Sequence, residues 1–557
     1  MAHLFFFFAA VAASLLWTAL FTAVAARVKP FGYLLRIIAV GIPVLFWLPW
    51  LDLTARLAWW ANFSLKSPVN WFGPTLTAFL SVLIGGLFIV RAGLSPRRGM
   101  PAGRWPIARL AVGFGAALLA ASTTLAILEQ DLKRWAVGLR AEATGMIMSV
   151  VPPPLAADAN AATAYREAQW LSKTAFAIPP EQILRLFGDN PLPVASEEVG
   201  EVLKRQAPLL DLIRRGTQRE ECRFDRDWTQ HCLEMLIDET EAMRALASLL
   251  TLSARRQAAD GQPAEALVDV ARLGRMAEHV AREPLPVSSL TGMDIDRLAL
   301  GALAEVLSQV TRGDQLNAID PLHLCQATEF RNAVKNSLLC DEATILNTAA
   351  HVADKRIFLS TLCEHVMWLD PVMKSPAGML PILRHWLDSL YRTFVLRGEV
   401  EDLRTRFDQF ANHCSRWFYE QRAPVARRKE ARDLDYLPGA GIYATMFKPV
   451  YVHLQDAVWR SEALHNIAGV LLAATRYRLA TGALPESLAA LVPDYLPSAP
   501  ADLFAPDNAV LRLVSTDSAW TVYSLGNNGR DDGGPGPQPD DKEPGEGKDD
   551  IGLSMKR

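Results

Sequence analysis

The sequence predicts a mostly α-helical protein in which a four-span transmembrane anchor precedes an α-helical domain and a small C-terminal α+β module. Three observations support this fold class. Residues 1–135 contain long uncharged apolar runs, residues 155–455 show helical periodicity with few strand signals, and residues 456–529 combine a helix with alternating apolar residues. A chain of 557 residues has room for several domains.

The prediction of membrane spans depends on the length of the apolar runs. A helix needs roughly 20 apolar residues to cross a bilayer, and residues 4–26 are an uncharged run of that length. This run is too long for a plain signal peptide, and Arg27 and Lys29 follow it. The second run is interrupted by Pro43 and Pro49. The predicted spans are residues 4–26, 34–51, 72–90 and 107–128.

Basic residues in the predicted loops indicate the orientation of this anchor. Loops rich in lysine and arginine stay on the cytoplasmic side of a membrane. Such residues gather after the first run and between the third and fourth runs, at Arg27, Lys29, Arg36, Arg91, Arg97, Arg98, Arg104 and Arg109. We therefore expect the N-terminus and everything after residue 128 to lie on the outer side.

All six cysteines lie in the region that we expect outside the cytoplasm. An even number of cysteines in an oxidising compartment favours disulfides, and Cys222 and Cys232 bracket a short charged loop that would suit one. A metal site and buried thiols are the alternatives, since several of these residues have histidine neighbours but none has the paired spacing of a zinc site. The disulfide candidates are Cys222, Cys232, Cys325, Cys340, Cys363 and Cys414.

Residues 239–284 predict a helical hairpin inside the domain of residues 155–455. Gly261 is placed to end the first helix and Pro263 to begin the second. Apolar residues recur at spacings of three and four in both helices, at Met243, Leu246, Leu250 and Ala254 and then at Ala266, Val270, Leu273, Ala277 and Val280. The turn "AADGQPAEAL" resembles that of a tetratricopeptide repeat. The sequence contains no second copy of this repeat, so it predicts a single hairpin. The hairpin is expected either to pack only within a bundle or to line a groove for a peptide partner.

The sequence contains no recognisable catalytic motif. There is no GxSxG, HExxH, P-loop or strand-linked GxGxxG segment, so no catalytic residue is predicted. A net charge of −3 and the lack of a basic stripe exclude a nucleic-acid partner. An enzyme with an unfamiliar site remains an alternative, for which His279, His351 or His385 would have to lie near carboxylates in a cleft.

The C-terminal module has a specific order of motifs. A helix that ends at Tyr477 to Gly482 is followed by Pro485, by "VPDYLPSAPADLF" and by two strands that lead into "YSLG". This order resembles the globular half of the major pseudopilin of type II secretion. With "NAATAY" and "ADGQPAEAL" added, the whole chain resembles a family of large bacterial inner-membrane proteins that carry such a module.

The pseudopilin resemblance implies a calcium ion in the loop after the last strand. Its ligands would be aspartates of the turn and of a later "DDI" segment, together with backbone carbonyls. In this chain the turn aspartate is replaced by an asparagine and a long insertion precedes "DDI". The candidate ligands are Leu525, Asn528, Asp531, Asp532, Asp549 and Asp550.

Two explanations of the last residues stay open. Calcium takes six to eight oxygen ligands, which carboxylates, Asn528 and the carbonyls beside Gly526 and Gly529 would supply. Alternatively, residues 530–557 are an acidic tail rich in glycine and proline that does not pack.

These inferences predict a non-catalytic, membrane-anchored scaffold or interaction subunit of a bacterial envelope assembly. We expect it in the bacterial inner membrane, with its large C-terminal region in the periplasm and in contact with a protein partner. The alternatives are an accessory component of a type II secretion-like system and an envelope enzyme with an unrecognised site.

Overall fold

The computed structural model describes the chain in segments, mostly helical. They are residues 2–25, 27–28, 34–47, 130–188, 191–228, 239–318, 328–354, 391–405, 407, 442–505, 509–526, 528–535 and 549–556. The chain divides into two compact units. Residues 1–139, 349–404 and 438–446 form the first unit, and residues 140–348, 405–437 and 447–557 form the second.

The first unit contains helix α1 (Ala2–Ala25) and a helix over residues 34–47. The two helices contact each other through buried polar groups. The Thr18 hydroxyl donates to the carbonyl of Ala39 at 3.0 Å, and the Trp47 indole donates to the Ser14 hydroxyl at 3.2 Å. A π-helical turn η2 (Tyr391–Val395) continues into a helix over residues 396–405, where Arg397 pairs with Asp131 at 2.8 Å.

The predicted four-span anchor is not supported. No helix in the described segments combines the length and the apolar character needed to cross a membrane. The described part of the helix at the predicted second span is residues 34–47, and the first predicted span lies in α1. The predicted spans 72–90 and 107–128 lie outside the described residues.

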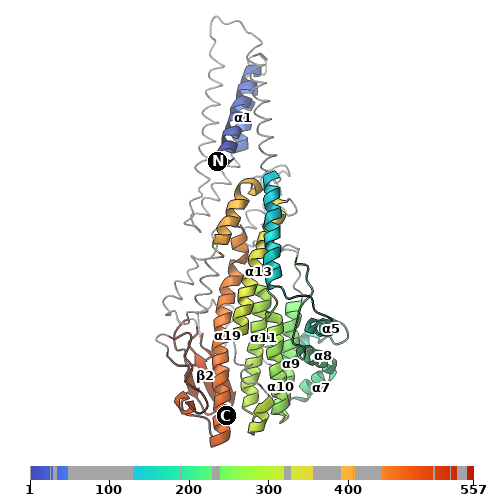
Figure 1. Cartoon of the computed structure of the whole chain (residues 1–557), viewed down its shortest axis with the longest axis vertical. Helices are drawn as coiled ribbons and strands as arrows, with labels where there is room; N and C mark the ends of the chain where they lie inside the picture. Colours follow the sequence, from blue (N-terminus) through green and yellow to red (C-terminus); the bar gives the residue numbers. More distant parts are fainter. Residues whose placement is uncertain are drawn as a thin grey trace. The chain divides into compact units, whose positions relative to one another are not determined.

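The second unit is built mainly from helices (Figure 1). Local sequence explains several helix starts, because the Asn160 side chain caps α5 and the Ser196 side chain caps α7, while prolines open α6, α10 and α11. The helices that lie in it wholly or in part are α5 (Ala161–Lys173), α6 (Pro180–Phe187), α7 (Glu197–Arg205), α8 (Ala207–Thr217), α9 (Glu239–Ala259), α10 (Pro263–Ala281), α11 (Pro286–Leu307), η1 (Gly313–Ala318), α13 (Thr328–Ala353) and α19 (Ile442–Thr481).

Helices α9 and α10 form the helical hairpin expected from the sequence. Gly261 adopts a φ of +79° just after α9, and Pro263 is the first residue of α10. The positive φ favours glycine because it has no Cβ. The residues predicted for the apolar face of each helix are buried, and they pack α10 against both α9 and α11.

A three-stranded antiparallel sheet packs against the same bundle. Its strands β1 (Arg512–Ser515), β2 (Ala519–Ser524) and β3 (Ile551–Lys556) lie in the order β1-β2-β3, with Trp520 opposite Met555. The 3-10 helix η3 (Leu488–Leu491) lies between α19 and the sheet in the chain, and the fully buried Trp520 donates its indole N–H to the carbonyl of Pro485 at 3.0 Å.

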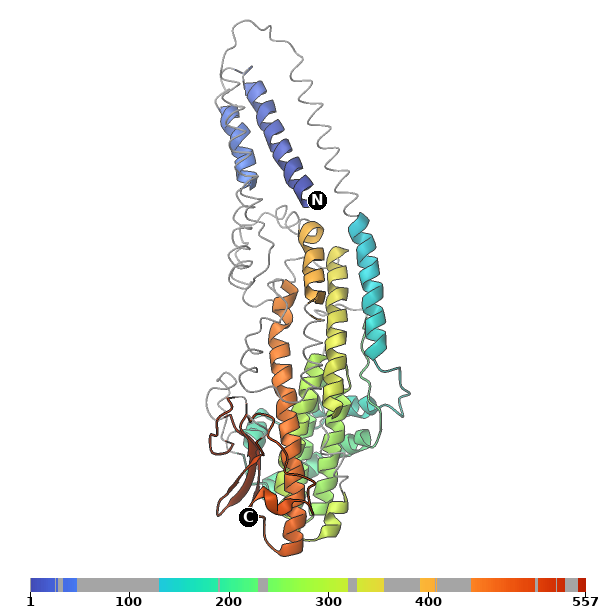
Figure 2. The same cartoon turned by 60° about the vertical axis from the view of Figure 1, so that its left-hand side comes forward.

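One apolar core joins the sheet to the helices. It contains side chains of α9, α10 and α11, the region Ala463–Ala474 of α19, and Phe504, Trp520 and Met555. Figure 2 shows the sheet lying along α19. The boundary predicted at residue 455 therefore falls inside α19, a 40-residue helix that belongs to both parts. The last residues of the predicted tail form β3, because Ile551 and Met555 are buried in this core.

Candidate functional site

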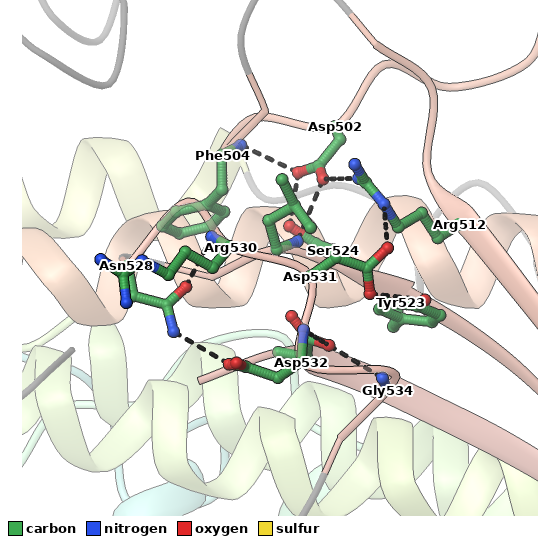
Figure 3. A network of polar contacts seen from close by, with 12 residues as sticks. Asp502, Phe504, Arg512, Tyr523, Ser524, Asn528, Arg530, Asp531, Asp532 and Gly534 are labelled. Carbon is green, nitrogen blue, oxygen red and sulfur yellow. Dashed lines mark hydrogen bonds and ion pairs between the residues drawn. The ribbon is translucent and has the colours of Figure 1, made fainter. Parts of the chain in front are cut away.

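The acidic loop beyond β2 is the site that the sequence predicts. Residues 528–535 and 549–550 come together next to the end of β2 (Figure 3). We call these residues, with Leu525 and Gly526, the acidic loop. Gly526 and Gly529 have φ values of +64° and +63°. A Cβ on Gly526 would lie 1.9 Å from the carbonyl oxygen of Asp549, so the turn and the later acidic pair touch only because this residue is glycine.

Asp549 is held from both sides of its carboxylate. One oxygen accepts from the guanidinium of Arg460 on α19, and the other accepts from the backbone N–H of Asn528 at 3.0 Å. The side chain is only 3% exposed. Arg460 also bonds Asp456 at 2.8 Å. Burial lowers the pKa of Arg460, but the charges of Asp456 and Asp549 outweigh burial and raise it.

Asn528 and Asp532 close the loop internally. The Asn528 amide donates to the carboxylate of Asp532 at 2.9 Å, and the same carboxylate oxygen accepts the N–H of Asp549 at 2.9 Å. The carbonyl oxygen of the Asn528 side chain accepts the N–H of Arg530 at 2.8 Å. Asn528 therefore directs both ends of its amide at protein groups.

Asp550 is the least satisfied acid of the loop. One of its oxygens accepts the N–H groups of Asp532 and Gly534 at 3.0 and 2.8 Å, whereas its Oδ1 is buried without a hydrogen-bond partner. Burial raises the pKa of Asp550, and the charges of Asp532 and Asp531 add to this shift.

Asp531 belongs to a second cluster on the sheet. It accepts from the Tyr523 hydroxyl at 3.0 Å, from the N–H of Gly533 at 3.0 Å and from the Arg512 guanidinium at 2.9 Å. Burial raises the pKa of Asp531, but these three donors outweigh it and the net shift is downward. Burial and the neighbouring Asp531 raise the pKa of Tyr523 to about 12.

Asp502 and Arg460 contact the loop from outside it, and sequence reasoning missed both. The buried Asp502 carboxylate accepts the N–H groups of Phe504 and Leu525 at 2.9 and 3.0 Å, and it also contacts Ser524 and Arg512. An aspartate side chain often accepts the backbone N–H of the residue two positions later and so forms a turn, and the segment "ADLF" carries this signal. Nothing in the local sequence of Arg460 indicates a partner 89 residues away.

These contacts do not fit a calcium site. Calcium requires six to eight oxygens around one point, but the carboxylates of Asp531 and Asp549 face guanidinium and N–H groups, whose positive ends would repel a cation. Oδ1 of Asp550 is buried and has no hydrogen-bond partner among the described residues. The described segments contain no group of three or more histidine, cysteine, aspartate or glutamate residues arranged to hold a metal ion.

Two of the six cysteines lie in the described residues. Cys222 and Cys340 are both buried free thiols. Burial raises the pKa of the Cys222 thiol, with a further contribution from Glu283, and burial raises that of Cys340 to about 12. The remaining candidates, Cys232, Cys325, Cys363 and Cys414, lie outside the described residues.

Two of the three histidines that the enzyme alternative would require lie in the described residues. His279 has no exposed surface and bonds the Tyr165 hydroxyl at 2.9 Å, and burial lowers its pKa to about 4. His351 is also buried, and His385 lies outside the described residues. A histidine that the sequence did not single out for this role, His465, lies 3.5 Å from Asp296 of α11, and both side chains are buried.

Comparisons with known proteins add no assignment. Neither a protein-family profile, nor a curated protein, nor a solved structure matched the chain. The description of the molecule therefore depends on its own geometry: a helical bundle and a small sheet share one core, and buried ionic groups connect them.

Proposed function

We propose that the chain is a non-catalytic interaction scaffold of the bacterial envelope. The observation that carries this proposal is an exposed apolar face on α6. Leu184, Ile183 and Phe187 are 69, 44 and 41% exposed, whereas Leu186 on the opposite side is buried against α7 and α9. A short helix that keeps three large apolar side chains in solvent is typical of a surface that contacts another protein.

The buried ionic groups support a structural role for the bundle. Asp269 on α10 has no exposed side-chain surface and accepts from Arg214 of α8 at 2.7 Å and from Arg272 at 2.6 Å. Ser253 and Gln257 of α9 donate to the same carboxylate. A carboxylate with this many donors fixes three helices together, which favours a rigid support over a reactive group.

The histidines do not favour the enzyme alternative. His279 and the pair of His465 and Asp296 are buried, so a substrate would reach them only if the helices separated. A catalytic acid or base must lie within hydrogen-bond reach of its substrate. The scaffold proposal requires no such access.

We also propose the periplasm as the compartment in which the scaffold acts. Support comes from the resemblance of residues 456–529 to a secretion pseudopilin. A reporter enzyme that matures only after export, fused after Arg557, should be active in cells. Activity of a cytosol-dependent reporter alone at that position would contradict this placement.

Photo-crosslinking from α6 tests the scaffold proposal. A photoreactive amino acid replaces Leu184 in the full chain, and a control chain carries it at Met148, which is 68% exposed on the helix of residues 130–150. We expect a discrete crosslinked product from position 184 and none of that size from position 148. Ile183→Glu in the same chain should abolish it, whereas equal products at both positions would refute the proposal.

A further inference from the structure

The acidic loop contains four carboxylates, and a fifth carboxylate, Asp502, and two guanidinium groups, Arg460 and Arg512, lie against it. Asp502, Asp531 and Asp532 lie on one side of the insertion, and Asp549 and Asp550 lie on the other. Arg460 contacts Asp549, and Arg512 bridges Asp502 and Asp531 at 3.5 and 2.9 Å. Arginine stays charged in proteins and offers five donors in a fixed geometry.

We propose that Arg460 and Arg512 take the place of a bound cation, so that this loop closes without metal. This inference is independent of the proposed scaffold function. It explains how the acids of this loop are neutralised, although the resemblance to a pseudopilin would expect an aspartate where Asn528 stands and no long segment before Asp549.

Arg460 neutralises the buried half of the loop. It reaches from α19, where it is anchored by Asp456 one helical turn earlier, to Asp549, the most buried acid of the pair 549–550. A guanidinium in this position supplies the positive charge that a calcium ion would supply, and it adds directed N–H donors. A cation could enter only if Arg460 left Asp549.

Backbone N–H groups supply the other hydrogen-bond donors to these acids. The N–H groups of residues 528, 532, 534 and 549 all donate to acids of the loop. In a calcium site the carbonyl oxygens, and not the N–H groups, point at the centre. In the described residues the loop is therefore organised around its acids by internal N–H donors, while Oδ1 of Asp550 is buried without a partner.

Calcium dependence of thermal unfolding tests this inference on the full chain. For the unchanged protein we expect the same melting temperature in 5 mM calcium chloride and in EDTA. For Arg460→Gln, which leaves Asp549 without its guanidinium, we expect a lower melting temperature in EDTA and a rise of about 2 °C or more with calcium, because a ligand that binds only the folded state stabilises it.

A matched control separates loss of a cation from general destabilisation. Arg478, on the same helix, bonds only backbone carbonyls of residues 307, 308 and 310. Arg478→Gln should lower the melting temperature without creating a calcium response. Arg460→Lys, which retains the positive charge, should remain indifferent to calcium.

Two results would overturn the inference. The first is a calcium-dependent rise in the melting temperature of the unchanged protein, and the second is an Arg460→Gln protein that melts lower but does not respond to calcium. If Arg460→Gln does not fold, calorimetric titration of the unchanged chain with calcium still decides, since heat of specific binding would refute a metal-free loop.

Discussion

The guanidinium of Arg460 contacts the carboxylate of Asp549, a residue 89 positions further along the chain. This ion pair connects the long helix α19 to the two residues that precede strand β3. Because Asp549 also accepts the N–H of Asn528, the pair holds the turn after β2, the end of the insertion and the bundle at one point. The acidic loop is thus part of the tertiary structure of the bundle.

The backbone of Asp549 lies so close to Gly526 that one added methyl group should strongly destabilise the fold. Gly526→Ala places a Cβ 1.9 Å from the carbonyl oxygen of Asp549 and requires a left-handed conformation. We expect a loss of about 2–4 kcal/mol in the free energy of unfolding, measured by urea denaturation. Gly533→Ala is the control, since Gly533 has a φ of +81° but no neighbour within 4 Å, and should cost about 1 kcal/mol. Equal losses for the two variants would argue against the steric explanation.

Helices α10 and α11 meet at Gly292. A Cβ there would lie 2.6 Å from the Cβ of Ala281 and 2.7 Å from the carbonyl oxygen of Ala277. Gly292→Ala should therefore force the helices apart and destabilise the protein by about 1–3 kcal/mol in chemical denaturation. Gly301→Ala on the same helix meets nothing within 4 Å and should stabilise it by up to about 1 kcal/mol. Opposite signs for the two variants are the decisive result.

The pair of His465 and Asp296 predicts a pH-dependent stability. Burial lowers the pKa of His465, but the charge and hydrogen bond of Asp296, the Ser461 carbonyl and Glu462 outweigh it, so the folded pKa is raised above about 6.5. Arg331 of α13 pairs with Glu462, and Phe330 packs on the imidazole. The stabilisation is then complete below pH 6.5 and is lost as the pH rises through the folded pKa.

Urea unfolding at pH 5.5, 7.0 and 8.5 measures this linkage. Asp296→Asn should cost about 3 kcal/mol at pH 5.5, where it removes the partner of a buried imidazolium. The difference from the unchanged protein should shrink as the pH rises. His465→Gln should show the same trend. A difference that is constant or grows with pH would contradict the assignment of the raised pKa.

The buried thiols predict a defined labelling pattern. In the folded protein Cys222 and Cys340 should react with a thiol reagent on the order of 100-fold more slowly than after unfolding, because burial suppresses the thiolate. After unfolding without reductant both should be labelled, and peptide mass spectrometry can score each one. If Cys222 is instead recovered in a disulfide with Cys232, the free thiol is wrong and the disulfide expected from the sequence is correct.

Local patterns were sufficient for much of the helical structure. The apolar faces of α9 and α10 follow from residue spacing, and the turn between them follows from Gly261 and Pro263. The end of α19 at Thr481 was likewise predictable, because Gly482 adopts a positive φ. In each case the helix or its end is determined by residues that are close together in the sequence, so the sequence pattern is enough to predict it.

The hydropathy of the N-terminal residues led to a wrong fold prediction. A window average counts apolar residues but takes no account of what a helix packs against, and residues 34–47 of the second apolar run form a helix that contacts α1. Ser14, Thr18 and Trp47 use polar groups to pair this helix with α1. Such helix-to-helix contacts are invisible to a measure of average hydropathy.

Taken alone, the amino-acid order determined which stretches are helical, where glycine and proline end or begin them, and that the C-terminal loop concentrates negative charge. Only the tertiary structure decided that residues 551–556 form a strand and that the acids meet arginines. The physical reason is distance along the chain: Ile551 and Met555 are buried only because Trp520 and α19 provide a core, and Asp549 meets Arg460 only after the sheet has packed on that helix.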